Sequence, residues 1–291
     1  LHFERFKNRH MKTIIKKSEL KSIYDIDCPT WKPIIEKYDG WVIDKTAGSP
    51  ADLWNGNAVE ILKTIQSETI DLIVTDPPYK IITGGDSNGK NSTRPKGILS
   101  GNRKLMKFIP KFSEWLPECY RVLKNGTHAY FMINSTNLTE MLVEVEKAGF
   151  KIHNILIWKK NNCTPSQFYM KNCEYIIFCR KGKAKYINNI GGSKTVHDFN
   201  NIIGNKVHPT EKPVELMSVY VENSSNENDI VLDPFMGAGS TGVACLKLNR
   251  KFIGIEIEID YFDIAKNRLM EIEKWLNVKL KNNTNYIFLT L

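Results

Sequence analysis

The tetrapeptide Asp76-Pro77-Pro78-Tyr79 combines residue types that could activate an amine, and it follows directly on the apolar run Asp71–Thr75. An exocyclic amine of a nucleobase is a poor nucleophile because its lone pair is delocalised into the ring. Two acceptors on its hydrogens would localise that lone pair, and the Asp76 carboxylate and the Pro77 carbonyl could provide them. Because proline has no N–H and a fixed φ, the turn offers carbonyls without competing donors.

Tyr79 adds a flat aromatic face on which an unstacked base could lie. Reaching a base inside a duplex requires flipping it out, which costs a few kcal/mol, and stacking on an aromatic ring returns about 1–3 kcal/mol. A four-residue match of this kind arises by chance about once in a thousand chains of this length, from average residue frequencies. The alternative, two prolines that only end a strand, explains the prolines but neither flanking residue.

A second candidate site is the glycine-rich turn that follows the apolar run Ile230–Leu232. Gly237, Gly239 and Gly242 match GxGxxG, in which glycines let the backbone approach a ligand and the following helix presents free amides. Glu256 lies at the end of the next apolar run, where its carboxylate could accept hydrogen bonds from both hydroxyls of a ribose. The pattern would suit a dinucleotide, and a tight structural turn is the alternative.

The position of this turn argues against a dinucleotide-dependent oxidoreductase. Only residues 243–291 follow Gly242, which leaves room for one strand and two helices but not for the rest of a Rossmann sheet. The missing strands must lie upstream, so the half of the sheet that binds the cofactor comes last in the chain.

Short apolar runs rich in β-branched residues and bounded by turn residues predict buried strands. They are Asp71–Thr75, Thr127–Ile133, Asn154–Trp158, Glu174–Cys179, Ile230–Leu232 and Phe252–Ile257. Patterns of helical period predict helices at Asn137–Ala148, Pro213–Glu222, Thr241–Leu248 and Tyr261–Leu276. Strands that alternate with helices predict an α/β fold with a mostly parallel sheet.

Positive charge gathers in two segments of the chain. Residues 80–124 carry a net charge of +7 and residues 147–185 carry +8, whereas the whole chain carries +9. Two basic blocks on a slightly acidic background indicate a polyanionic partner, and ordinary solvated surface is the alternative. The stretch Thr83–Arg103, rich in Gly, Ser, Asn and Lys, predicts a long loop that is functional or disordered.

The composition disfavours several classes of protein. No apolar run approaches the roughly 18 residues that span a bilayer, and the basic N-terminus lacks the apolar stretch of a secretory signal. None of the six cysteines form a CxxC pair and the six histidines show no ligand spacing, so we expect no metal site. We therefore expect a reduced, cytoplasmic protein without a membrane partner.

At these motifs the chain resembles the amino-methylating DNA methyltransferases, which carry DPPY for the target amine and FxGxG for S-adenosylmethionine. Here FxGxG is Phe235-Met-Gly-Ala-Gly239, and it follows DPPY along the chain, as in the β class, a circular permutation of the methyltransferase fold. His208–Pro213 is similar to the segment that packs near the methionine end of the cofactor. The motif Leu53–Asn57 usually ends in Gly-Asp, and Asn57 in place of Asp puts a charge-based role there in doubt.

The resemblance implies a circularly permuted, Rossmann-like fold of an S-adenosylmethionine-dependent methyltransferase, with a mostly parallel seven-stranded sheet flanked by helices. This domain would span residues 50–279, after an N-terminal extension (1–49) and before a tail (280–291), with a short target-recognition insert at about 180–207. The residues implied for the amine are Asp76, Pro77, Pro78 and Tyr79. Those implied for the cofactor are Asp233, Phe235, Gly237, Gly239, Ser240, Thr241, Glu256 and Lys212. Those implied for DNA are Lys90, Arg94, Lys96, Arg103 and Lys104.

The activity implied by the resemblance is transfer of a methyl group from S-adenosylmethionine to N6 of adenine in double-stranded DNA. The base would be flipped out and methylated by direct displacement. Asp in the first motif position mostly marks adenine enzymes, and Ser mostly marks cytosine enzymes. Because this preference is a tendency, N4 of cytosine is the alternative. A homodimer and a cognate restriction endonuclease are left open by the resemblance, and association with the nucleoid is expected. Rival classes are a nicotinamide oxidoreductase, a catalytically silent DNA-binding module, and a methyltransferase of RNA or protein.

Overall fold

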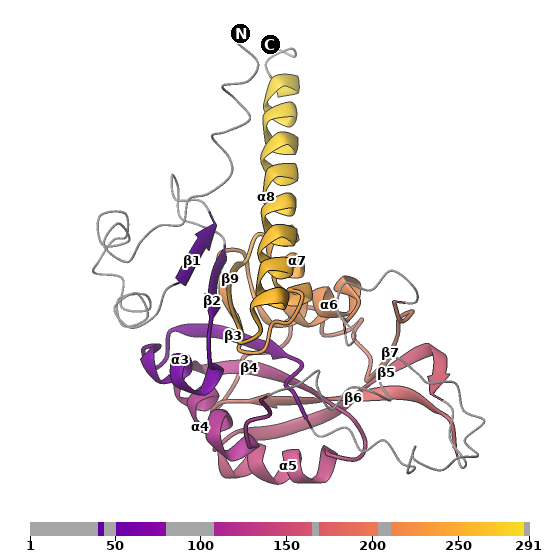
Figure 1. Cartoon of the computed structure of the whole chain (residues 1–291). Helices are drawn as coiled ribbons and strands as arrows, with labels where there is room; N and C mark the ends of the chain where they lie inside the picture. The colour runs from indigo at the N-terminus through magenta and orange to yellow at the C-terminus, as the bar shows by residue number, and fades with distance from the viewer. Residues whose placement is uncertain (1–39, 44–50, 80–107, 165–168, 203–210, 288–291) are drawn as a thin grey trace, which may run out of the picture.

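One sheet with helices on both faces forms the body of the protein (Figure 1). The structure, a computed structural model, describes residues 40–43, 51–79, 108–164, 169–202 and 211–287. In chain order the strands are β1 (Gly40–Ile43), β2 (Ala51–Asn55), β3 (Ile70–Thr75), β4 (Leu123–Ile133), β5 (Lys151–Thr164), β6 (Lys171–Arg180), β7 (Val196–Asp198), β8 (Ile230–Asp233) and β9 (Lys251–Glu256). They lie in the order β1-β2-β9-β8-β3-β4-β6-β5-β7.

Most neighbouring strands in this sheet are parallel. The run β2-β9-β8-β3-β4 is parallel throughout. Strand β6 is antiparallel to both β4 and β5, and β1 is antiparallel to β2. The expected α/β fold with a mostly parallel sheet is therefore confirmed.

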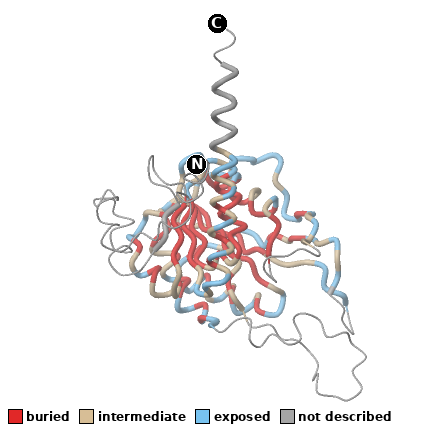
Figure 2. Tube along the Cα trace, turned by 45° about the horizontal axis from the view of Figure 1, so that its top comes forward, coloured by how far each residue is buried: buried red, intermediate tan, exposed pale blue. Residues whose placement is uncertain are grey.

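Two sets of helices cover the two faces of the sheet. The helices are α3 (Ala58–Thr64), α4 (Phe112–Val122), α5 (Leu138–Lys147), α6 (Val214–Ser224), α7 (Ser240–Lys247) and α8 (Ile259–Ile287). Side chains alternate across a strand: Ile73 of β3 packs in the apolar cluster with α3, α4 and α5, whereas Leu72 and Val74 pack in the cluster with α6, α7 and α8. The buried residues accordingly gather along the strands in Figure 2.

Each apolar run that predicted a strand corresponds to one, and each helical pattern corresponds to one of α5 to α8. The count of seven strands was wrong, because the described chain contains nine. Six of the nine strands correspond to the predicted apolar runs, and β1, β2 and β7 do not. The edge strands β1 and β7 are short, with four and three residues, and each pairs with a single neighbour.

The permuted chain order is visible in the middle of the sheet. Strand β8, which leads into the glycine turn, pairs with β3, which leads into the DPPY turn, with Ile73 opposite Leu232. The Thr75 hydroxyl donates a hydrogen bond of 2.6 Å to the Asp233 carboxylate across this pairing. The two motifs are thus neighbours in space although 158 residues separate Thr75 from Asp233.

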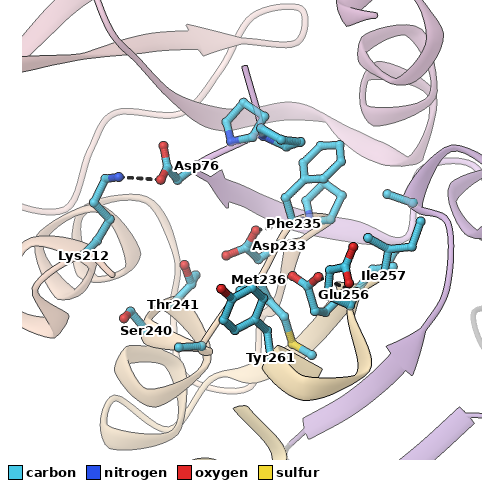
Figure 3. A pocket seen from close by; sticks show the side chains of 18 of the residues that line it. Asp76, Lys212, Asp233, Phe235, Met236, Ser240, Thr241, Glu256, Ile257 and Tyr261 are labelled. Carbon is cyan, nitrogen blue, oxygen red and sulfur yellow. Dashed lines mark hydrogen bonds and ion pairs between the residues drawn. The ribbon is translucent and has the colours of Figure 1, made fainter. Parts of the chain in front are cut away.

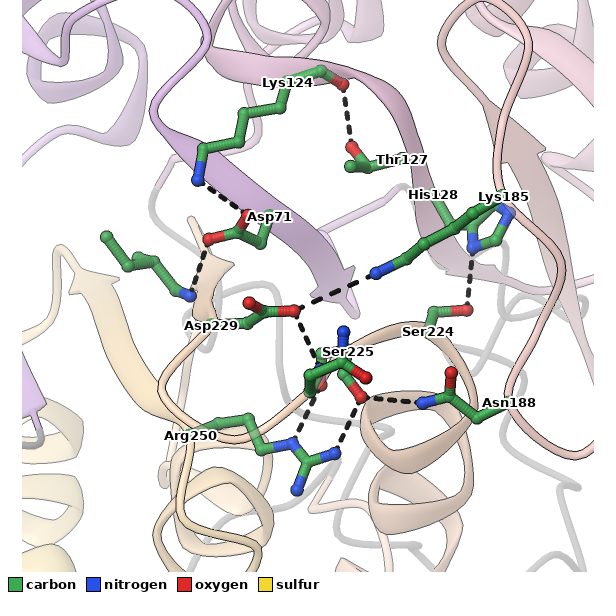
Figure 4. Close-up of polar contacts among 12 residues, drawn as sticks. Asp71, Lys124, Thr127, His128, Lys185, Asn188, Ser224, Ser225, Asp229 and Arg250 are labelled. Carbon is green, nitrogen blue, oxygen red and sulfur yellow. Dashed lines mark hydrogen bonds and ion pairs between the residues drawn. The ribbon is translucent and has the colours of Figure 1, made fainter.

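Charged groups at the amino ends of the central strands are paired with one another (Figure 4). Lys124 donates to Asp71 over 2.7 Å, and the second oxygen of this carboxylate accepts the backbone N–H of Ile230. Arg250 donates to the side chain and the carbonyl of Ser225. The bonds of Asp71 hold β3 to β4 and β8, and those of Arg250 hold the start of β9 to the end of α6, so the amino edge of the sheet serves stability.

Helix α8 continues to Ile287 and projects from the body of the protein (Figure 1). It therefore crosses residue 279, where we placed the end of the domain, and β1 falls within the expected N-terminal extension. The expected recognition insert begins where β6 ends and contains β7 in its described part. No helix in the described ranges is both long and apolar enough to cross a membrane.

Candidate functional site

Three acidic residues from the predicted site meet at the carboxyl edge of the sheet. Asp76 follows β3, Asp233 ends β8 and Glu256 ends β9, and these strands are parallel neighbours. The carboxyl ends of parallel strands form the usual ligand-binding edge of an α/β sheet. All three residues line one open pocket of about 1080 Å³, a volume that includes solvent at its mouth (Figure 3). This space is large enough for a ligand of nucleoside size.

The glycine turn joins β8 to α7 and forms one wall of this pocket. Gly237 and Gly239 have φ angles of +50° and +77°, the left-handed region that glycine enters without strain. A Cβ atom on Gly239 would lie 3.1 Å from the Cβ of Ala265 in α8, so this position also needs a small residue. Ser240 and Thr241 follow as the buried first residues of α7, and the N-terminal amides of this helix favour polar or anionic ligand groups.

The Glu256 carboxylate closes the pocket beside the turn. One oxygen accepts the backbone N–H of Gly237 at 3.0 Å, and the other accepts that of Glu258 at 2.8 Å. Burial raises the pKa of Glu256 above its ordinary value, although these amide bonds oppose the shift. Each carboxylate oxygen has a further lone pair, so Glu256 can still accept hydrogen bonds from ligand hydroxyls.

Asp233 lies deeper, between the two turns. Its Oδ1 accepts hydrogen bonds from the Thr75 hydroxyl at 2.6 Å and from the backbone N–H of Phe235 at 3.1 Å. Burial raises the pKa of Asp233 to about 6, in spite of the hydrogen bonds from Thr75 and Thr241 that favour the charged form. Asp233 therefore fixes the DPPY turn to the glycine turn.

Asp76 belongs to a buried group of charges that the sequence did not predict. Its Oδ2 accepts a hydrogen bond from Lys212, which lies just before α6, and Lys212 also lies 3.4 Å from Glu174 of β6. Glu174 in turn accepts from Lys160 of β5. The second oxygen of Asp76, Oδ1, is buried and has no hydrogen-bond partner among the described residues.

Burial and the shared lysine shift the pKa values of these groups. Burial and the Glu174 carboxylate raise the pKa of Asp76, with Lys212 opposing. Burial works in the same direction on Glu174, but the ammonium groups of Lys212 and Lys160 outweigh it and lower the pKa of Glu174. Burial disfavours the charged Lys212, yet Asp76 and Glu174 raise its pKa above the ordinary value. The same ammonium of Lys212 thus favours the charged form of both carboxylates.

The rest of the DPPY turn lies against the apolar core. Pro77 is buried, Pro78 and Tyr79 are half-buried and line the pocket, and Tyr79 packs on the cluster of α3, α4 and α5. Burial raises the pKa of Tyr79, so its hydroxyl stays protonated. Phe235 lines the same pocket and is held edge-to-face by the Trp115 ring at a centroid distance of 5.1 Å.

The structure brings the residues predicted for the amine and the cofactor together at this edge, and all of them except Gly239 line the pocket of Figure 3. Gly239 lies in the same turn, just before α7. The residues predicted to bind DNA lie outside the described residues; they are Lys90, Arg94, Lys96, Arg103 and Lys104.

Some features of the site were not predicted or were left in doubt. Asn57 accepts the backbone N–H of Val59 at 2.9 Å and caps α3, so its amide does accept a hydrogen bond. Sequence reasoning missed Lys160 and Glu174, which no motif marks, and the pocket residue Tyr261. The described ranges hold no group of three His, Cys, Asp or Glu side chains that could bind a metal ion.

Comparison with known proteins agrees with this geometry. A family model described as DNA methylase, covering N6- and N4-methyltransferases, matches residues 70–267, more than half of the chain. The Type II methyltransferase M.HinfI of Haemophilus influenzae is 33% identical over 243 residues, which cover 75% of this chain and 68% of that protein. M2.DpnII of Streptococcus pneumoniae is 31% identical over 240 residues, 75% of this chain and 88% of that protein.

Solved structures show the same architecture. M1.HpyAVI in complex with SAM has a TM-score of 0.57 and 28% identity, over 75% of this chain and all of that one. The PvuII DNA methyltransferase, specific for N4 of cytosine, has a TM-score of 0.58 over 76% of this chain and 90% of that one. At 16% identity this second likeness concerns the fold alone. The chain belongs to the N6/N4 DNA methylase family and is a DNA amino-methyltransferase.

Proposed function

We propose that this protein methylates N6 of adenine in double-stranded DNA with S-adenosylmethionine as the methyl donor. The observation that carries the proposal is the buried Asp76 Oδ1, which has no partner in the described chain and lies beside the glycine-turn pocket. An unsatisfied buried carboxylate oxygen is costly, so it indicates a donor that arrives with a ligand. The amino group of a flipped base is such a donor.

The pocket residues fit S-adenosylmethionine. Glu256 provides a carboxylate for the ribose hydroxyls, the glycine turn allows close approach of the backbone, and Asp233, Ser240 and Thr241 add polar groups near the start of α7. Tyr261 and Ile257 add an aromatic and an apolar wall, as a purine ring requires (Figure 3). When bound, this cofactor supplies a methyl group on an electrophilic sulfonium centre.

The DPPY residues act on the target amine. Asp76 and the carbonyl of Pro77 would accept hydrogen bonds from its two N–H groups, which localises the nitrogen lone pair for attack, and Tyr79 would stack on the ring of the flipped base. As the N–C bond forms, the S–C bond of the methyl donor would break, and the methylated nitrogen would lose one proton. Lys212 lines the same pocket and bonds to Asp76, so it can serve both the amine site and the predicted methionine end of the cofactor. No residue of the site needs to form a covalent bond with the base.

Two features support DNA and adenine as the target. The basic segments 80–124 and 147–185 provide cations for the phosphate backbone, and Lys90, Arg94, Lys96, Arg103 and Lys104 belong to the first of them. Asp rather than Ser opens the motif, as in most adenine enzymes that this chain resembles. N4 of cytosine is the alternative target.

The direct test is to express the protein in a host that lacks DNA methylation, digest the host DNA and identify the modified nucleosides by mass spectrometry. We expect N6-methyladenine. N4-methylcytosine in its place would overturn the base assignment, and a separate run with host RNA tests the rival substrate. Comparing the thermal shift produced by S-adenosylmethionine with that produced by NAD excludes or supports the oxidoreductase.

A further inference from the structure

Four largely buried side chains form a continuous line of alternating charges that ends at Asp76. We name this line Lys160–Glu174–Lys212–Asp76 the charge chain. Lys160 and Lys212 both contact Glu174, and Lys212 also contacts Asp76. Their side chains are only 16%, 17%, 7% and 19% exposed, in the order of the chain, so solvent screens these interactions weakly.

The outer end of the charge chain is firmly held. Lys160 and Glu174 lie on the paired strands β5 and β6, where Trp158 is directly opposite Glu174. The Lys160 ammonium also lies 4.8 Å from the centre of the Trp158 ring, within range of a cation–π contact. Glu174 is therefore fixed from the sheet side, independently of Asp76.

The inner end of the charge chain is held by the segment just before α6. Lys212 follows Glu211, whose carboxylate lies 2.7 Å from Arg268 of α8. Lys212 thus enters the site on an anchored backbone and meets two carboxylates, of which only Asp76 lines the pocket. Lys212 bonds Oδ2 of Asp76 and leaves Oδ1 without a partner in the described chain. Because Lys212 is shared with Glu174, its ammonium can move toward Glu174 when another donor reaches Asp76.

We propose that Glu174 is a positioning residue for methyl transfer: it shares the Lys212 ammonium with Asp76, so that Asp76 is held in place and still accepts a strong hydrogen bond from the target amine. This inference rests on the proposed role of Asp76 as the amine acceptor. Lys160 holds Glu174 through an ion pair and balances its charge.

The charged groups near Asp76 in the described chain determine how each substitution changes the ionisation of Asp76. Glu174 and burial make Asp76 harder to ionise, whereas Lys212 and Lys160 make it easier. Tyr79 and Asp233 also lie near enough to be influenced by Asp76. Removing the Glu174 charge must therefore favour ionised Asp76, and removing the Lys160 charge must disfavour it.

The test is the single-turnover rate of methyl transfer, measured from pH 4 to 9 with saturating DNA and S-adenosylmethionine, for Glu174→Gln, Lys160→Gln and Glu174→Asp. For Glu174→Gln we expect the acid limb of the profile to move to lower pH. Its plateau rate should fall about tenfold, which corresponds to about 1.4 kcal/mol of lost transition-state stabilisation. For Lys160→Gln the acid limb should move to higher pH. Glu174→Asp keeps the charge and should keep the position of the acid limb.

The matched control is Glu144→Gln, which removes a carboxylate that pairs with Lys147 on α5, away from the pocket, and should leave the profile unchanged. Cofactor affinity of each variant is measured by titration calorimetry and should equal that of the parent. Acid limbs that do not move, or that move in the same direction for Glu174→Gln and Lys160→Gln, would overturn the inference. Full activity of Asp76→Ala in the same assay would instead overturn the proposed function, so the two failures are distinguishable.

Discussion

Asp233 should make the stability of the protein depend on pH in a way that a single substitution removes. Its carboxyl group is buried at the centre of the site, and its pKa of about 6 lies well above the ordinary value of 3.8. Asn has nearly the same shape and keeps one oxygen to accept from the Thr75 hydroxyl and the Phe235 N–H. The substitution Asp233→Asn therefore removes the charge with little change in packing.

The sign and size of the effect follow from proton linkage. Between the two pKa values the folded protein binds a proton that the unfolded chain does not, so the free energy of unfolding falls as the pH rises from about 4 to 6. A gap of about two pH units corresponds to a total of about 3 kcal/mol, of which about 2 kcal/mol is recovered on going from pH 8 to pH 4.5. The amide that replaces the carboxyl group in the variant does not titrate, so the variant gains most over the parent at pH 8.

The assay is urea denaturation of both proteins at several pH values, without cofactor, followed by circular dichroism. The difference between the two free energies of unfolding cancels groups that titrate alike in both proteins. We expect this difference to favour Asp233→Asn by about 2 kcal/mol more at pH 8 than at pH 4.5. A difference that does not vary with pH would show that Asp233 does not bind its proton more tightly in the folded protein. Since Asp233 lines the pocket, the same variant should bind S-adenosylmethionine more weakly.

Further predictions concern the pocket and the basic segment. Glu256→Gln should weaken S-adenosylmethionine binding about tenfold or more, because a hydrogen bond to a charged group is worth about 1.5–3 kcal/mol; calorimetric affinity equal to that of the parent would contradict the role of Glu256. Gly239→Ala should lower the free energy of unfolding by about 1–2 kcal/mol, the cost of a left-handed conformation for an L-residue, and denaturation curves that superimpose would contradict it. Replacing two lysines or arginines within residues 83–103 by Gln should make log K for DNA fall less steeply with log salt, by about 0.9 for each lost phosphate contact; an unchanged slope would show that these side chains do not contact phosphates.

The core strands and both motifs could be predicted because the physics that forms them is local. A buried parallel strand such as β3 is a continuous apolar run, and the turns after β3 and β8 carry prolines and glycines that mark where a strand ends. The parallel sheet then requires that Asp76 and Asp233 share one edge. The glycine turn lies late in the chain, after the DPPY turn. This order alone indicated that the half of the sheet that binds the cofactor comes last.

The charge chain could not be predicted, because it depends on pairings between distant segments. Glu174 resembles the polar start of an ordinary strand, and its contact with Lys212 arises only once β6 pairs with β4 and the chain returns before α6. Lys212 was expected at the cofactor, and no local pattern indicates that its ammonium reaches Asp76. The strands β1 and β7 were also missed, because segments of four and three residues are too short for a pattern to distinguish them from loops.

The most direct test of the account compares the parent protein with Asp76→Ala in one host that lacks DNA methylation. Digested host DNA is analysed for N6-methyladenine, and binding of S-adenosylmethionine to both purified proteins is measured as the control for folding. We predict N6-methyladenine with the parent, none with Asp76→Ala, and cofactor binding by both. N6-methyladenine at the parent level in the Asp76→Ala host, or no methylated base in the parent host, would contradict the account.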